Sequence, residues 1–250
     1  MRGPGIDSKA HQPHSGLRRR VALWLLSLAL PTLAVADMTV IYEVETGRKG
    51  SMRTSQVVTD SMVRTSDGTT DTIFMIDTGE MILIDHRKEE FYRTSIDEMN
   101  AAFAELDENL GSNPMVRRMM MGKAKNVEVE EGPNPQTIAD YYCQHYIVTM
   151  GEGMRIEIWA TSDLETPRPY WDAKKLSYAS MGPIGSRFKS MLEAMREIDG
   201  FPLQTHINAR VMGIRSNSES TAVEVQLGQV ADDAFDIPDG YQEGESPFAR

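Results

Sequence analysis

The 250-residue sequence has a single cysteine, few aromatic residues (7%) and too few cations to balance its acids. One cysteine excludes an internal disulfide, so the burial of apolar surface has to stabilise the fold. The formal net charge of −11 disfavours binding to nucleic-acid phosphates or to anionic lipid surfaces. We therefore expect no nucleic-acid partner.

The sequence also lacks an apolar run long enough to cross a membrane, because Val21–Leu33 holds 13 residues where about 20 are needed. Three arginines precede this run, and Ala34-Val35-Ala36 follows it. This order is typical of a secretory signal peptide. We expect cleavage after Ala36 and a periplasmic mature protein without an integral membrane segment. Residues 1–16 are long and polar for such a leader, which leaves translation starts at Met1 and at Leu17 both open.

Three segments follow from this interpretation. Residues 1–36 form an N-terminal extension and signal peptide, residues 37–242 a single domain, and residues 243–250 a loose polar tail. The leader carries five cations and one anion, so the mature chain keeps 21 Lys and Arg against 36 Asp and Glu, a charge of −15. Its length is sufficient for one sizeable core.

The first part of the mature chain alternates apolar and polar residues with period two, starting at Met38, Val40 and Tyr42. This pattern predicts an antiparallel meander. We expect its further strands at Ser55–Val58, Ser61–Thr65, Thr72–Ile76, Met81–His86 and Glu90–Thr94. Asp67-Gly68 favours a tight hairpin turn. Met81–Ile84 is apolar at every position, which predicts a strand covered on both faces.

Helical spacing of apolar residues begins at Ser95, where Ser95-Ile96-Asp97-Glu98 is a capping box. We predict helices at Ser95–Leu110, Asn113–Lys125 and Gly185–Ile198, and helical sequence between Pro169 and Tyr178. Strands are expected at Thr137–Thr149 and Met154–Ala160, joined at Gly151–Gly153, and at Leu203–Ile214 and Thr221–Val230, joined at Ser216–Ser220.

No βαβ alternation occurs in this order of elements. The prediction is an α+β fold, in which a curved antiparallel sheet forms an unclosed half-barrel and amphipathic helices cover its concave face.

Motifs in the second half resemble those of a known group of exported proteins. These are Ile138–Cys143, the segment Ile156-Glu157-Ile158-Trp159, Gly200-Phe201-Pro202-Leu203 and the closing Phe235–Tyr241. The chain resembles the family called domain of unknown function 4412, which is remotely similar to the Lol lipoprotein carriers. The resemblance implies their half-barrel fold, and it carries no ligand-contacting residue over to this sequence.

Candidate chemistry is sparse. The mature chain has three histidines, His86, His145 and His206, and places Cys143 and His145 on one face of a strand. Two ligands do not make a metal site, and a packed histidine beside a buried thiol is the more ordinary interpretation. Nucleophilic catalysis by Cys143 would need a lowered pKa and a nearby base. No other catalytic arrangement is present, so the sequence supports neither an enzyme nor a cofactor.

Methionine is abundant, with 16 residues after Met1, and its flexible thioether suits a cavity of variable content. We predict a periplasmic binding protein that holds a lipid or acyl chain between sheet and helices. The predicted ligand-binding residues are Met99, Phe103, Met115, Met119, Met120, Phe188, Met191 and Met195. Two alternatives stay open: an envelope protein-interaction or stress-sensing module with an envelope protein partner, and a metal-handling protein using Met and His.

Overall fold

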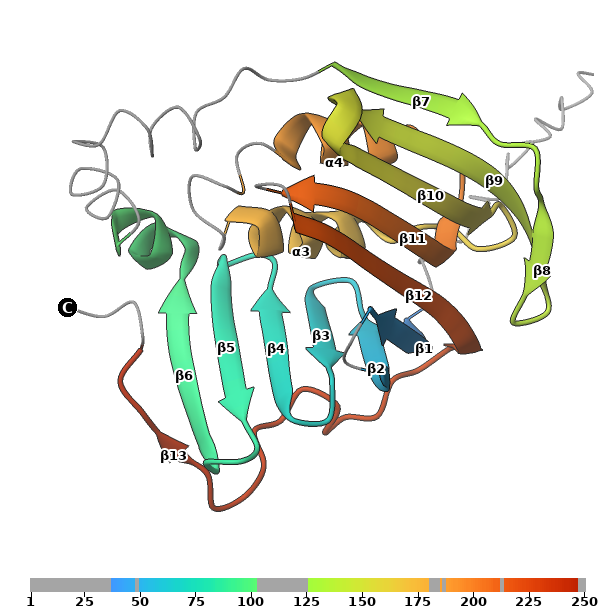
Figure 1. Ribbon diagram of the computed structural model, residues 1–250. Helices are drawn as coiled ribbons and strands as arrows, with labels where there is room; N and C mark the ends of the chain where they lie inside the picture. Colours follow the sequence, from blue (N-terminus) through green and yellow to red (C-terminus); the bar gives the residue numbers. More distant parts are fainter. Residues whose placement is uncertain are drawn as a thin grey trace, which may run out of the picture. The chain divides into compact units, whose positions relative to one another are not determined.

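The computed structural model describes residues 37–47, 50–102, 126–179, 185, 188–211 and 214–246, all within one compact unit that starts at Val35. The fold is α+β. Within the described residues, a sheet of thirteen strands bends around two helices, and β13 and β7 lie at its ends (Figure 1). The two ends do not pair with each other, so the sheet is an unclosed half-barrel, as predicted.

The first six strands form the predicted antiparallel meander (Figure 1). Asp67-Gly68 makes the turn between β3 and β4, where Gly68 has a φ of 80°. The Asp67 carboxylate accepts the backbone N–H groups of Thr69 and Thr70 at 2.8 and 2.7 Å. The strands are β1 Met38–Thr46, β2 Gly50–Val58, β3 Met62–Ser66, β4 Thr70–Met75, β5 Glu80–Asp85 and β6 Glu90–Ser95.

The capping box predicted at Ser95 is present. The Ser95 N–H donates to Glu98 Oε2, the Glu98 N–H donates to Ser95 Oγ, each at 3.2 Å, and residues 96–102 are helical. The rest of the predicted helix Ser95–Leu110 and the whole of Asn113–Lys125 lie outside the described residues.

The strand predicted at Thr137–Thr149 is two strands. Ala139 and Asp140 have φ values of 46° and 69°, which an extended strand cannot accommodate, so the chain turns there. The strands of residues 127–161 are β7 Val127–Glu131, β8 Gln136–Ile138, β9 Tyr141–Met150 and β10 Met154–Thr161. The 3₁₀ turn Gly151–Gly153 joins β9 to β10, as expected.

Two helices cover the concave face (Figure 1). Helix α3, Arg168–Ala179, buries Tyr170, Trp171 and Ala173 in a core shared with β1 to β5. Helix α4 packs on β9 and β10 through Met191. It spans only Lys189–Met195, shorter than the predicted Gly185–Ile198, because Phe188 supplies no side-chain cap and residues 196–198 form tighter turns.

The last hairpin is β11 Phe201–Val211 and β12 Ile214–Leu227. Ser216–Ser220, predicted as its turn, lies inside β12, because β1 and β11 pair with this polar stretch on both sides and supply its backbone hydrogen bonds. Gly200 directly precedes β11 and has a φ of 91°, and a Cβ there would lie 2.1 Å from the Thr161 carbonyl oxygen. No other residue fits this position without a shift of β10.

The C-terminal segment covers the outer face of the first strands. Phe235, Ile237 and Tyr241 pack on Ile73, Ile82 and Ile84, while Met81 belongs to the inner core, so β5 is covered on both faces as predicted. Gln242–Glu243 form β13, which pairs with β6 in parallel. The backbone pairing extends to Gly244, whose N–H donates to the Phe91 carbonyl at 2.9 Å.

Candidate functional site: a hollow between the sheet and helix α3

A hollow of about 290 Å³ lies between the inner face of β2 to β5 and helix α3. Its apolar wall consists of Phe74, Met81, Leu83 and Ala173, of which only Leu83 is partly exposed. Its size is at the lower end of the range of small-molecule sites, about 300 Å³ and above. The hollow is bounded by the sheet on one side and by helix α3 on the other.

Polar side chains form one continuous row along the floor of the hollow. Gln56 of β2 lies opposite Thr65 of β3, and Thr65 lies opposite Thr72 of β4. Leu83 of β5 continues the row. Gln56 is 8% exposed, and among the described residues the side chains of this row make no hydrogen bonds to protein groups. Of these side chains only Gln56 is buried, whereas Thr72 is half-buried and Thr65 is exposed to solvent. A buried amide normally has a hydrogen-bond partner, so water or a ligand has to supply one to Gln56.

Lys174 of α3 brings a positive charge to the same hollow. Its Nζ lies 5.4 Å from the centroid of the Tyr170 ring, a cation–π contact, and no described carboxylate is within ion-pair distance. Burial lowers the pKa of Lys174, because an apolar environment disfavours the ammonium form.

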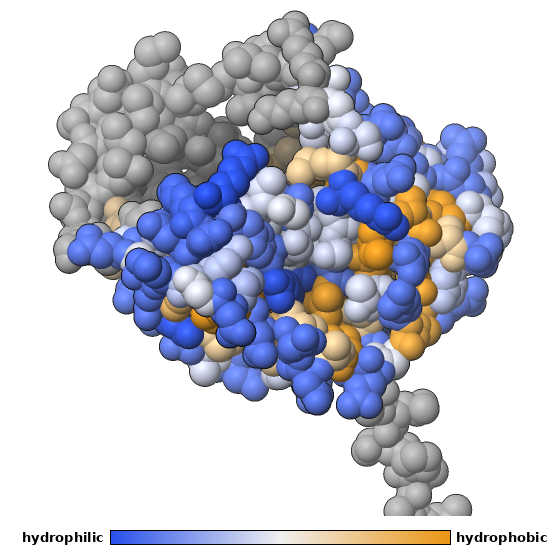
Figure 2. Space-filling model, turned by 90° about the horizontal axis from the view of Figure 1, so that it is seen from below, coloured by the Kyte–Doolittle hydropathy of each residue, from blue (hydrophilic) through white to orange (hydrophobic). Residues whose placement is uncertain are grey.

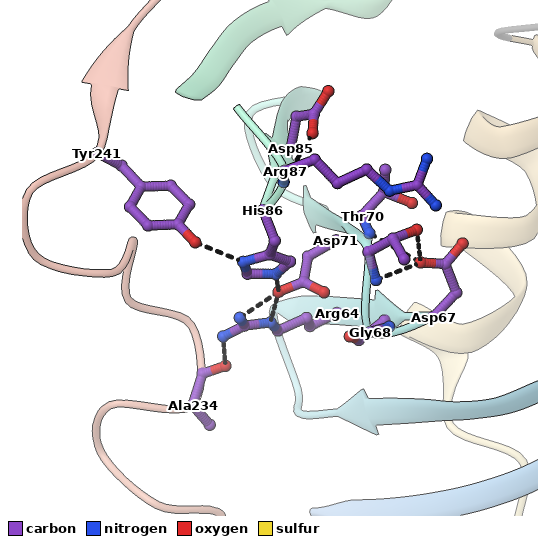
Figure 3. Close-up of polar contacts among 12 residues, drawn as sticks. Arg64, Asp67, Gly68, Thr70, Asp71, Asp85, His86, Arg87, Ala234 and Tyr241 are labelled. Carbon is purple, nitrogen blue, oxygen red and sulfur yellow. Dashed lines mark hydrogen bonds and ion pairs between the residues drawn. The ribbon is translucent and has the colours of Figure 1, made fainter. Parts of the chain in front are cut away.

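The opposite face of the same strands carries a paired network (Figure 3). Arg64 Nε donates to Asp71 Oδ2 at 3.1 Å, and a second, shorter contact joins Arg64 Nη2 to the same oxygen. His86 Nε2 lies 2.9 Å from Asp71 Oδ2, and its Nδ1 lies 2.9 Å from the Tyr241 hydroxyl. Arg64 Nη1 also donates to the Ala234 carbonyl at 2.6 Å. The network therefore fastens the C-terminal segment to the outer face.

Asp71 is the centre of this network and is 1% exposed. Burial alone would raise the pKa of Asp71, but its contacts with Ser66, Arg64 and His86 hold that pKa below the ordinary 3.8. Its second oxygen, Oδ1, makes no hydrogen bond of regular geometry. Each charged group of the network bonds to another member or to the tail, so its role is structural.

Cys143 and His145 share a buried face of β9, as the sequence predicted. Burial raises the pKa of the Cys143 thiol to about 11, so the thiol is protonated at neutral pH and a poor nucleophile. The His145 ring stacks on Trp159 with centroids 4.4 Å apart, and a Cβ on Gly132 would lie 2.1 Å from His145 Nδ1. The ring is thus enclosed as a packing element.

The third histidine, His206, contacts the Trp159 ring edge-on with ring centroids 4.7 Å apart. Its Nε2 lies 2.9 Å from Glu219, and His145 Nε2 lies 3.2 Å from Glu157. The two histidines thus have separate carboxylate partners, and within the described parts of the chain no three His, Cys, Asp or Glu side chains are grouped to hold a metal ion.

The predicted ligand-binding residues divide into two groups. Met99 is fully buried in the inner core, Met191 is 2% exposed, and Phe188 and Met195 are half-buried beside β9 and β10. None of these four lines the hollow under α3. The other four, Phe103, Met115, Met119 and Met120, lie outside the described residues.

Sequence reasoning missed Gln56, Thr65, Thr72 and Lys174. A signal was present, because three polar residues occupy positions of the predicted meander whose neighbours two residues away, Val58, Val63 and Phe74, are buried. The sequence does not specify the register of the strands, so it does not show that these residues lie side by side.

The surface offers few apolar side chains. The large exposed ones among the described residues are Met52, Val129, Tyr142, Val223 and Leu227. Figure 2 shows the molecule from below. This face is largely hydrophilic, and its hydrophobic residues (orange) lie mainly towards the right of the view. Among the described residues, no helix is both long and apolar enough to span a bilayer.

The family model for the domain of unknown function called DUF4412 matches residues 36–241. The chain belongs to this family. This finding confirms the resemblance seen in the sequence motifs. No curated protein matches the sequence.

Several solved structures are similar. An uncharacterized conserved protein from Thermus thermophilus has a TM-score of 0.45 and 7% identity, with 85% of this chain and 91% of that chain covered. The MucA/MucB complex of Pseudomonas aeruginosa gives 0.39 and 10%, covering 80% and 55%. A LolA superfamily protein from Nitrosomonas europaea gives 0.27 and 8%, covering 81% and 90%. At these low scores the likeness carries no inference about activity.

Proposed function

We propose that this chain is a periplasmic binding protein that holds an apolar ligand, a lipid or acyl chain, between its sheet and its helices. The observation that carries the proposal is the hollow of about 290 Å³ under α3, with Phe74, Met81 and Leu83 on its wall. Each methylene buried there contributes about 0.8 kcal/mol, so about ten buried methylenes would correspond to micromolar binding before the entropic cost of association.

The methionine-rich helices extend this proposal. Met99, Phe188, Met191 and Met195 belong to the packing between sheet and helices, and a longer chain that parts these side chains would contact them. Phe103, Met115, Met119 and Met120, outside the described residues, are proposed to contribute to the same wall. Flexible thioethers re-pack around ligands of different length at little cost.

A fluorescent fatty-acid probe tests the proposal. Native protein should take up the probe, and Leu83→Asp should weaken uptake at least tenfold, because it places a charge on the wall of the hollow. The matched control is Leu227→Asp, which makes the same change on a strand position that is 55% exposed and outside the hollow.

Circular dichroism and thermal unfolding of both variants establish that they are folded. Equal loss of uptake in the two variants, or no uptake by the native protein, would count against an apolar site under α3.

Export is the second part of the proposal. We infer cleavage after Ala36, so that the mature protein starts at Asp37. N-terminal sequencing of protein from the periplasmic fraction tests this. An intact leader, or a first residue more than two positions from Asp37, contradicts it.

The alternative is a protein-interaction module, and the edge strand β7 favours it. In the described part of the chain β7 pairs only with β9, and its outer edge is open. Its exposed side chains include Glu128, Glu130 and Glu131, so a basic extended peptide would suit this edge as an added strand. Native mass spectrometry of protein isolated from its own periplasm separates the two functions, since one retains a lipid and the other a polypeptide.

A further inference from the structure

The hollow under α3 is not uniformly apolar, and its polar part has a defined arrangement. Gln56, Thr65 and Thr72 stand side by side on three adjacent strands, and Lys174 faces the hollow from the helix above them. The apolar residues Phe74 and Met81 form the next pair along β4 and β5. The hollow therefore has a polar part and an apolar part, as an amphiphile has.

Charge decides which head group fits the polar part. Lys174 has no described carboxylate partner, and its one ring contact, with Tyr170, leaves donors of the ammonium group free. Gln56 and the two threonines add hydroxyl and amide donors that form no hydrogen bond to another described residue. Four neighbouring donor side chains, one of them cationic, match an anionic oxygen-rich head group better than a neutral one.

Size limits the rest of the ligand. The hollow of about 290 Å³ is roughly twice as large as the ~150 Å³ engineered cavity that binds benzene. It therefore accommodates about twelve non-hydrogen atoms, a head group with part of one alkyl chain, whereas a lipid with two chains does not fit without movement of α3.

We propose that the hollow binds a single-chain amphiphile with an anionic head, a carboxylate or a phosphate monoester. The head pairs with Lys174 and accepts hydrogen bonds from the polar row, and the chain lies on Phe74, Met81 and Leu83. This inference rests on the proposed function and names the ligand class of the same site. The partial burial of Lys174 supports it, because an ammonium group in a partly apolar site gains from a paired anion.

The long-range field of the protein does not explain such a preference. The mature chain carries a charge of −15, which repels anions at a distance. At about 0.15 M salt, screening over about 8 Å reduces this repulsion, so a preference for anions measured there reports on contacts inside the hollow.

Isothermal titration with three twelve-carbon ligands, dodecanoate, dodecyl phosphate and dodecanol, tests the inference below their aggregation concentrations. The native protein should bind at least one anion about tenfold or more tightly than the alcohol, since a hydrogen bond to a charged group is worth that factor. The tighter of the two anions identifies the head group.

Lys174→Met should abolish the preference for the anion and leave dodecanol binding unchanged. Lys175→Met is the matched control, because it removes the same charge from the neighbouring, exposed position of α3. Lys174→Arg retains the charge and should retain the preference, which guards against loss of fold as the cause.

The outcomes separate the inference from the proposed function. Equal binding of acid and alcohol by native protein, or equal effects of Lys174→Met and Lys175→Met, overturns the anionic head while an apolar site remains. No binding of any of the three ligands overturns both.

Discussion

On the outer face of β3 and β4, Arg64 and Asp71 bond to each other, to His86 and to the C-terminal segment. On the inner face of the same strands, the paired residues Thr65, which is exposed, and Thr72, which is half-buried, line the hollow and form no hydrogen bond to another described side chain. Successive residues of a strand point to opposite faces, so the two sets differ only in what covers them. Polar groups of the outer face bond to one another and to the C-terminal segment, and those of the inner face are the groups that we propose to contact a ligand.

The largest effect should come from breaking the outer network. Asp71→Ala leaves the half-buried Arg64 without its carboxylate and should lower the free energy of unfolding by about 3 kcal/mol. Thr72→Ala, the next residue on the other face, is the matched control and should cost about 0.5 kcal/mol or less. Urea unfolding with unchanged m-values measures both. Similar losses in the two variants would remove the distinction between the faces.

A smaller effect should follow from pH. The pKa of Asp71 is lowered in the folded protein, so its contribution to stability is fully present above the ordinary value of 3.8. That contribution is lost as the pH falls through 3.8 towards the lowered pKa. The urea midpoint of native protein should therefore fall over this interval more steeply than that of Asp71→Asn, which has no carboxyl to protonate. Parallel curves for the two proteins would contradict the assignment.

The meander, the capping box at Ser95 and the two-sided cover of β5 could be predicted because local patterns specify them. The positions where strands end were harder to predict. Ala139 and Asp140 have a positive φ, but neither is a glycine and no proline is adjacent, so the sequence gives no sign of the turn. The polar stretch Ser216–Ser220 has the composition of a turn, but it is a strand because β1 and β11 pair with it. The structure of Ser216–Ser220 thus depends on pairing between strands that are distant in the sequence, and local sequence patterns do not reveal such pairing.

The candidate site could be predicted only in outline. Amphipathic helices over a curved sheet implied an apolar interior, and the hollow under α3 is such a space. The residues that line it follow from strand register, which brings Gln56, Thr65 and Thr72 together from three separate strands. Lys174 joins them through the docking of α3, a tertiary contact without a local signal.

Two glutamines of equal exposure allow a direct comparison between a polar group with protein partners and one that faces the hollow, and the smallest change in stability is expected for the second. Gln56 and Gln204 are both 8% exposed, but Gln204 bonds to Gln136, to His206 at 3.0 Å and to Glu219 at 2.9 Å, whereas Gln56 faces the hollow. Gln204→Leu should lower the free energy of unfolding by about 1 to 3 kcal/mol, because it removes the hydrogen bonds of a buried amide to Gln136, His206 and Glu219.

Gln56→Leu should instead leave the free energy of unfolding unchanged or raise it by up to about 1 kcal/mol, since it replaces an amide without a protein partner by an apolar group. The same variant should bind dodecanoate more weakly and dodecanol at least as well as native protein does. Urea unfolding and calorimetric titration on the same preparations measure the two quantities. A marked loss of stability in Gln56→Leu would mean that this amide stabilises the fold. The proposed difference between the two faces of the sheet would then be wrong.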